Sequence, residues 1–140
     1  MSFFREIIME LDEIKKHWDT NAKDNTTALC STTKTATIKR LEINAFAGVI
    51  SSLIRDDSPK CLLEVGCGNG YNLFGLEGLF PTIEFEGIDY SEVMIASAND
   101  IKNERTGSKI VFKVADFLNF NSKILASLGP ILITFTIYNC

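Results

Sequence analysis

The 140-residue sequence has few of the side chains on which metal sites depend. It contains one histidine, His17, and its four cysteines form no Cys-x-x-Cys pair and have no histidine at metal-ligand spacing. We therefore expect no metal site. We expect the cysteines to be reduced thiols that serve as small apolar residues, and His17 to lie on the polar side of a helix end.

The sequence also lacks an excess of positive charge and a long uninterrupted apolar run. A net charge of −4 and a pI of about 5.0 do not suit a nucleic-acid partner. The longest apolar tract, 124–138, is broken by Gly129-Pro130 and is too short for a membrane span. Glu6 interrupts the start of the chain where a signal peptide is apolar. We expect a cytoplasmic protein without a membrane or nucleic-acid partner.

The residues that are present suit one globular domain. The chain is 46% hydrophobic, with 10 phenylalanines, so it can build a core. It has no internal repeat and no low-complexity segment. Helical spacing predicts one helix over 3–18 and a second from about 33–35 to Leu53. Apolar positions of the second helix are Ile38, Leu41, Ala45, Phe46, Val49, Ile50 and Leu53.

After Pro59, predicted strands alternate with predicted helices. The strands are 60–65, 83–89, 109–114 and 131–137, and the helices are 71–80, 91–103 and 121–128. Ser91 is the expected N-cap of the helix that follows it. Such alternation predicts an α/β fold with a parallel sheet and right-handed crossovers.

A glycine turn follows the first of these strands. Gly66, Gly68 and Gly70 make the turn tight and leave its backbone bare, and a predicted helix begins at Tyr71. A strand, a glycine loop and a helix N-terminus together form the usual small-molecule site of an α/β protein.

Three acids, Glu64, Asp89 and Asp116, stand at or just after the ends of three predicted strands. Each by itself is explained by capping of a following turn or helix. The carboxyl ends of parallel strands share one edge of the sheet, where ligands bind. The three acids therefore predict a ligand site beside the glycine loop.

Two ligand classes fit such a loop. A dinucleotide site needs Gly-x-Gly-x-x-Gly, but its third glycine position is occupied here by Tyr71, and Glu64 would repel a pyrophosphate. S-adenosylmethionine has no phosphate and carries a sulfonium and an amino group, both positive. The residue types therefore favour S-adenosylmethionine, with another nucleotide-binding α/β domain as the alternative.

Three segments in order resemble the class I S-adenosylmethionine-dependent methyltransferases. Residues 63–70 (LEVGCGNG) look like their motif I, residues 87–96 (GIDYSEVMIA) like the segment with the ribose-binding acid, and residues 114–117 (VADF) like the adenine segment. The stretch 18–42 is similar, more weakly, to the N-terminal cap of small-molecule members. The resemblance implies a Rossmann-like three-layer sandwich with a mostly parallel sheet, preceded by N-terminal helices.

The resemblance also implies roles for individual residues. Glu64 would hold the amino group of the cofactor, Asp89 the two ribose hydroxyls and Asp116 the adenine amino group, while Phe117 would offer a backbone N–H to the ring. Tyr90 would border the adenine. The implied cofactor-binding set is Glu64, Gly66, Cys67, Gly68, Gly70, Asp89, Tyr90, Met94, Asp116 and Phe117. For Lys34, Lys39 and Arg40 a solvated helix face is expected ahead of a contact with the cofactor carboxylate.

The resemblance is incomplete. Family members have seven strands, whereas this sequence supplies about four, expected in the order 3-2-1-4. We divide the chain into a helical cap, 1–58, and a cofactor-binding half domain, 59–140, and expect a truncated member. The uncharged strand 131–137 would leave a free edge, which predicts pairing with a second copy or another chain.

The predicted function is methyl transfer to a small-molecule acceptor, with no identifiable catalytic base. The alternative is a catalytically incompetent S-adenosylmethionine-binding fragment or a binding module that depends on a partner.

Overall fold

The computed structural model describes residues 13, 15–17, 19–20, 23, 35–54 and 60–116, and the backbone of 135–139. The predicted helix 121–128 lies outside them.

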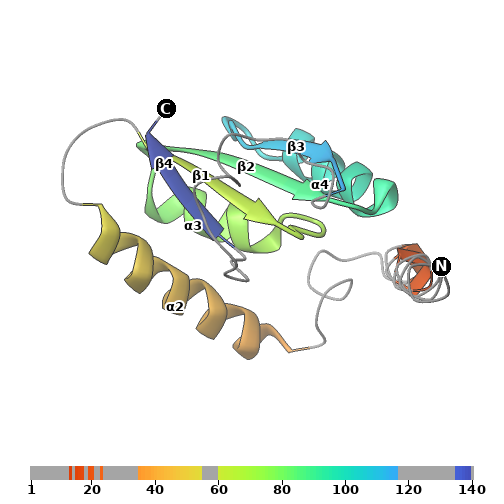
Figure 1. The fold of residues 1–140 in the computed structure, drawn as a ribbon, viewed down its shortest axis with the longest axis horizontal. Helices are drawn as coiled ribbons and strands as arrows, with labels where there is room; N and C mark the ends of the chain where they lie inside the picture. Colours follow the sequence, from red (N-terminus) through yellow and green to blue (C-terminus); the bar gives the residue numbers. More distant parts are fainter. Residues whose placement is uncertain are drawn as a thin grey trace, which may run out of the picture.

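A four-stranded sheet forms the centre of the fold (Figure 1). Its strands are β1 (Lys60–Val65), β2 (Ile83–Asp89), β3 (Val111–Val114) and β4 (Phe135–Asn139), in the order β3-β2-β1-β4. β1 and β2 pair in parallel, as do β2 and β3. The predicted α/β fold, its mostly parallel sheet and its strand order are confirmed.

The direction of the fourth strand differs from the prediction. β4 runs antiparallel to β1, with Phe135 opposite Glu64 and Asn139 opposite Lys60. The strand therefore starts at the edge of the sheet where β3 ends, so the chain needs no crossover to the opposite edge, as a parallel strand would. Part of the predicted strand, 131–134, lies outside the described residues.

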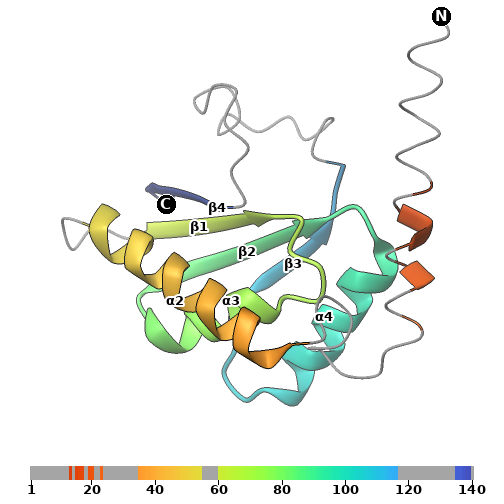
Figure 2. The same ribbon diagram turned by 90° about the horizontal axis from the view of Figure 1, so that it is seen from below.

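Three helices cover one face of the sheet (Figure 2). They are α2 (Ala36–Leu53), α3 (Tyr71–Leu79) and α4 (Glu92–Glu104). The described residues thus form one helical layer and the sheet of the predicted sandwich. Residues 13, 15–17, 19, 20 and 23 are also helical, and His17 is exposed there as expected.

Local sequence explains where α4 begins. The Oγ of Ser91 accepts a hydrogen bond from the backbone N–H of Met94 at 3.1 Å, which confirms the predicted N-cap. Glu92 in the first turn and Lys102 in the last suit the helix dipole.

The core lies between the sheet and the helices. It contains buried side chains from β1, β2, β3 and all three helices, among them Leu62, Leu73, Phe85 and Phe112. α2 contributes through one face only: Ile50 is its buried residue, whereas five other predicted apolar positions are exposed.

The two described cysteines, Cys61 and Cys67, differ in their bonding. Cys67 is a buried free cysteine, but Cys61 is disulfide-bonded, so the expectation of reduced thiols is wrong for Cys61. Sequence spacing carries no information on which thiols the fold brings together.

None of the described helices combines the length and apolar character required to cross a membrane.

Candidate functional site

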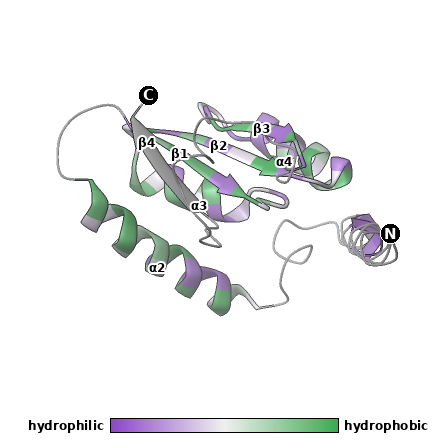
Figure 3. Ribbon diagram, viewed as in Figure 1, coloured by the Kyte–Doolittle hydropathy of each residue, from purple (hydrophilic) through white to green (hydrophobic). Residues whose placement is uncertain are grey.

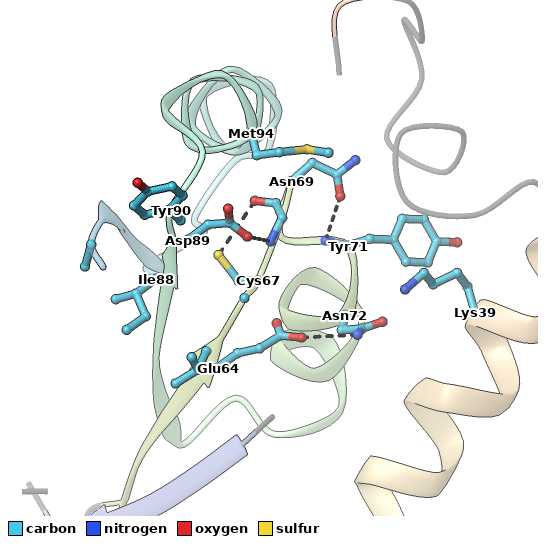
Figure 4. A pocket seen from close by; sticks show the side chains of 14 residues that line it. Lys39, Glu64, Cys67, Asn69, Tyr71, Asn72, Ile88, Asp89, Tyr90 and Met94 are labelled. Atoms are coloured by element: carbon cyan, nitrogen blue, oxygen red, sulfur yellow. Dashed lines mark hydrogen bonds between the residues drawn. The ribbon is translucent and has the colours of Figure 1, made fainter. Parts of the chain in front are cut away.

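A cavity of about 440 Å³ opens at the carboxyl ends of β1 and β2 (Figure 4). Its walls come from the loop after β1, the first turn of α3, the end of β2, the start of α4 and one residue of α2. The lining residues are Lys39, Glu64, Val65, Gly66, Cys67, Gly68, Asn69, Tyr71, Asn72, Ile88, Asp89, Tyr90, Met94 and Ala115.

The loop after β1 has the left-handed backbone that its glycines allow. Gly66, Gly68 and Gly70 have φ values of 72°, 54° and 77°. The backbone N–H groups of Gly66 and Cys67 both donate to the carbonyl of Ile88, at 2.8 and 3.0 Å, which fastens the loop to β2.

Asp89 ties this loop to the start of α4. One carboxylate oxygen accepts from the N–H of Gly68 at 2.7 Å, and the other accepts from the N–H of Ser91 at 2.8 Å. The side chain is half-buried and also lines the cavity. Because a carboxylate offers about four acceptor positions, both oxygens can accept further bonds from a ligand.

Glu64 presents a buried carboxyl group to the cavity. Its side chain is 2% exposed, and Oε1 accepts a hydrogen bond from the Asn72 amide at 3.2 Å. Oε2 of Glu64 and Oδ1 of Asn72 are both buried without a hydrogen-bond partner. Burial raises the pKa of Glu64 from 4.5 to about 8, against the lowering effect of Asn72 and Lys39. Two orphaned acceptors, one of them chargeable, mark a place for a cationic donor.

Lys39 enters the site from α2. Its side chain is 12% exposed, and its Nζ forms an ion pair with Glu42 at 2.8 Å. Figure 4 shows the ammonium group beside Tyr71 and directed at the cavity. The expectation of a solvated helix face is therefore wrong for Lys39.

Residues of the N-terminal helical stretch contact the turn between β2 and α4. The Lys15 Nζ lies 4.9 Å from the centre of the Tyr90 ring, and the Ser91 hydroxyl donates to Asp19. These contacts bring the start of the chain to the same edge of the sheet as the cavity.

Seven residues of the predicted set line the cavity. They are Glu64, Gly66, Cys67, Gly68, Asp89, Tyr90 and Met94. Burial raises the pKa of the Cys67 thiol, so the thiol stays protonated and unreactive in the cavity lining.

The other three predicted residues do not line it. Gly70 stands behind the loop, where a Cβ atom would lie 2.5 Å from Cζ of Phe112. Asp116 is half-buried outside the lining, and Phe117 lies outside the described residues. Ala115 takes part in their place, and its N–H donates to the Asp89 carbonyl at 2.9 Å.

Sequence reasoning missed the contribution of the first turn of α3. Asn69 lies at the end of the loop, and Tyr71 and Asn72 follow Gly70 on the helix. The sequence contained the signal: side chains in the first helical turn after a glycine loop lie next to the ligand site that the loop forms. Asn72 is the most informative of them, since its amide is the neighbour of Glu64.

Comparisons with known proteins identify the family of the chain and a similar fold. A family model described as "Methyltransferase domain" matches residues 56–129. The plantazolicin methyltransferase BpumL, crystallised with a pentazolic desmethylPZN analog and SAH, is 24% identical with a TM-score of 0.54, over 84% of this chain and 45% of that one.

The structure of BpumL with SAH alone gives the same identity and TM-score, over 86% of this chain and 46% of that one. The chain thus spans less than half the length of this similar structure. No curated protein has a significantly similar sequence.

Proposed function

The chain belongs to the methyltransferase-domain family, and from this premise we propose that its cavity binds S-adenosylmethionine and presents the methyl group to a small-molecule acceptor. The likeness to BpumL, which was crystallised with SAH, supports the choice of cofactor. The acceptor class rests on the resemblance of the sequence to small-molecule members.

One observation supports this proposal most directly: Oε2 of Glu64 and Oδ1 of Asn72, on two side chains that bond to each other, are both buried without a partner. The amino group of the cofactor is a cation with several N–H donors, and it would satisfy both atoms. A dinucleotide phosphate presents only acceptor oxygens and would leave these two buried atoms without a donor. Glu64 and Asn72 therefore bind the amino group.

Asp89, Tyr90 and Met94 would hold the adenosine. Asp89 has free acceptor positions for the ribose hydroxyls while it keeps its bonds to Gly68 and Ser91. Tyr90 is 41% exposed and Met94 is buried, so the two offer an aromatic face and an apolar floor to the adenine. Asp116 and Phe117 remain candidates for the polar edge of the ring.

Lys39 would pair with the carboxylate of the cofactor. Its ammonium group has three donors, of which the ion pair with Glu42 uses one. The carboxylate of the cofactor, placed at the cavity mouth near Tyr71, would accept from the remaining donors of Lys39. This assignment gives both charged ends of the methionine part an opposite charge from the protein.

When bound, the cofactor supplies a methyl group on a positive sulfur, already activated for in-line displacement. The chain has to hold the cofactor in one orientation and keep water from the reacting atoms. The loop backbone and the buried walls of the cavity do both.

Calorimetric titration with S-adenosylmethionine, S-adenosylhomocysteine and NAD tests the cofactor assignment. We expect binding of the first two and not of NAD, and a large loss of affinity in Asp89→Ala. Unchanged affinity in that variant would contradict the ribose assignment.

Single-turnover methyl transfer with a panel of metabolites tests the activity. Transfer to at least one of them supports the enzyme. Tight binding of the cofactor with no transfer to any acceptor supports the alternative, a binding module without catalysis of its own.

A further inference from the structure

Helix α2 carries a second apolar face that no described residue covers. Ile38, Leu41, Val49 and Leu53 are 49, 63, 57 and 58% exposed, and Ala45 between them is also exposed. We call these five residues the α2 stripe. Figure 3 shows hydrophobic segments recurring along this helix. Contiguous exposed apolar surface of this kind usually marks an interaction site.

The stripe is separate from the face that holds α2 on the domain. Ile43, Phe46, Ala47 and Ile50 pack on the core from a neighbouring face of the helix. At 3.6 residues per turn, the stripe occupies an arc of roughly 120° next to that face. The helix therefore keeps its place in the fold without using the stripe.

The spacing of the stripe is symmetric about Ala45. Leu41 and Val49 stand four residues before and after it, and Ile38 and Leu53 stand about two turns away on either side. Two copies of such a helix can pair antiparallel about a two-fold axis, because large side chains then meet large ones and Ala45 meets Ala45. A two-fold interface requires this self-complementarity.

Gly48 stands about one turn after Ala45, at the edge of the stripe, and supports a close approach of a second helix on that side. It lies inside α2, where glycine weakens a helix relative to alanine, yet a Cβ at this position would touch nothing within 4 Å. The described fold thus gives no steric reason for glycine there. Ala45 and Gly48 together would let a second helix axis come near, since the distance between packed helices depends on the side chains at the contact.

We propose that the α2 stripe is the interface between two copies of this chain, with the two α2 helices antiparallel and Leu41 of one copy facing Val49 of the other. The interface is independent of the cofactor site and of the proposed function. A contact made by one helix from each copy is smaller than the about 800 Å² per partner of a typical stable complex. We therefore expect a weak dimer that is detected at high protein concentration.

Sedimentation equilibrium of the full chain over a wide concentration range tests this interface. The parent protein is expected to dimerise. Leu41→Lys and Val49→Glu should each weaken the dimer at least tenfold, because each places an unpaired charge against an apolar side chain. The double variant should regain most of the affinity, because the two new charges are opposite and face each other across the axis.

Three controls accompany these variants. Leu79→Lys changes an equally exposed leucine on α3, 54% exposed, and should leave association unchanged. Gly48→Ala should raise the thermal midpoint of the monomer but weaken the dimer. Far-ultraviolet circular dichroism of each variant checks that the fold is kept, as expected for exposed positions.

Two results would overturn the proposal. The first is a parent chain that stays monomeric at all concentrations. The second is a dimer that survives both single substitutions on α2 but is lost in Thr136→Lys, because this result would assign association to the edge of β4, as the free edge of strand 131–137 predicts. Failure of cofactor binding would not affect either result.

Discussion

Replacement of Glu64 by glutamine separates the electrostatic role of this residue from its shape. Burial raises the pKa of the carboxyl group from 4.5 to about 8 in the folded chain. Between these pH values the folded chain holds a proton that the unfolded chain has lost, so the free energy of unfolding falls as the pH rises from 4.5 to 8. At about 1.4 kcal/mol per pH unit, this loss reaches about 5 kcal/mol as an upper limit.

Glu64→Gln has no charge to bury. Its free energy of unfolding should therefore match that of the parent near pH 4.5 and exceed it increasingly toward pH 8, by up to about 5 kcal/mol. Urea denaturation at a series of pH values measures this difference. Glu84→Gln on β2 is the matched control, because its carboxyl group is exposed, and it should not change the pH dependence.

The same substitution should weaken binding of the cofactor. A hydrogen bond between an ammonium and a carboxylate contributes about 1.5–3 kcal/mol, so S-adenosylhomocysteine should bind roughly 10- to 150-fold more weakly to Glu64→Gln. At pH 7 the free parent is mostly protonated at Glu64, since the pKa is about 8. Binding of a cation at this carboxylate should then release almost one proton.

Calorimetry in buffers with different ionisation enthalpies measures that proton. The affinity of the parent should rise with pH up to about 8, and this dependence should disappear in Glu64→Gln. Equal affinities for parent and variant, together with no proton release at pH 7, would refute the placement of the amino group at Glu64.

Three further substitutions test other parts of the site. Gly70→Ala should lower the free energy of unfolding by about 2–4 kcal/mol, because it combines a φ of 77° with a Cβ 2.5 Å from the Phe112 ring; a denaturant midpoint equal to that of the parent would contradict this. Asp89→Ala should lower the free energy of unfolding by about 2 kcal/mol, because the bonds to Gly68 and Ser91 are lost, and it should also weaken cofactor binding. Lys39→Met should weaken the binding of S-adenosylhomocysteine but not of adenosine. It should also shift the pH dependence of binding to higher pH, because Lys39 lowers the pKa of Glu64. An equal loss of affinity for both ligands would contradict a contact between Lys39 and the cofactor carboxylate.

The local elements around the site followed from the sequence with small errors at their ends. β1 and β2 begin and end at the predicted residues, and α3 and α4 end within one residue of the prediction. Apolar runs, the N-cap at Ser91 and the glycine loop are short-range signals, which local chain geometry is sufficient to produce. The position of Asp89 at the cavity followed in the same way, from the shared edge of parallel strands.

The contributions of α2 could not be read from periodicity. Its sequence has apolar residues on two neighbouring faces, and only packing against α3 and the core decides that Ile50 is buried while Leu41 is exposed. The same packing turns Lys39 toward the cavity, although its sequence neighbours suggest a solvated surface.

By itself, the sequence determined the α/β pattern, the glycine loop and the acids placed at strand ends, because each depends on residues close together in the chain. Only the tertiary structure decided the direction of β4, the pairing of Asn72 with Glu64 and the orphaned oxygen that remains. Strand direction depends on where a distant segment enters the sheet, and burial of a carboxyl group depends on every element around it. These long-range contacts place a buried carboxyl group with an unpaired oxygen beside the glycine turn.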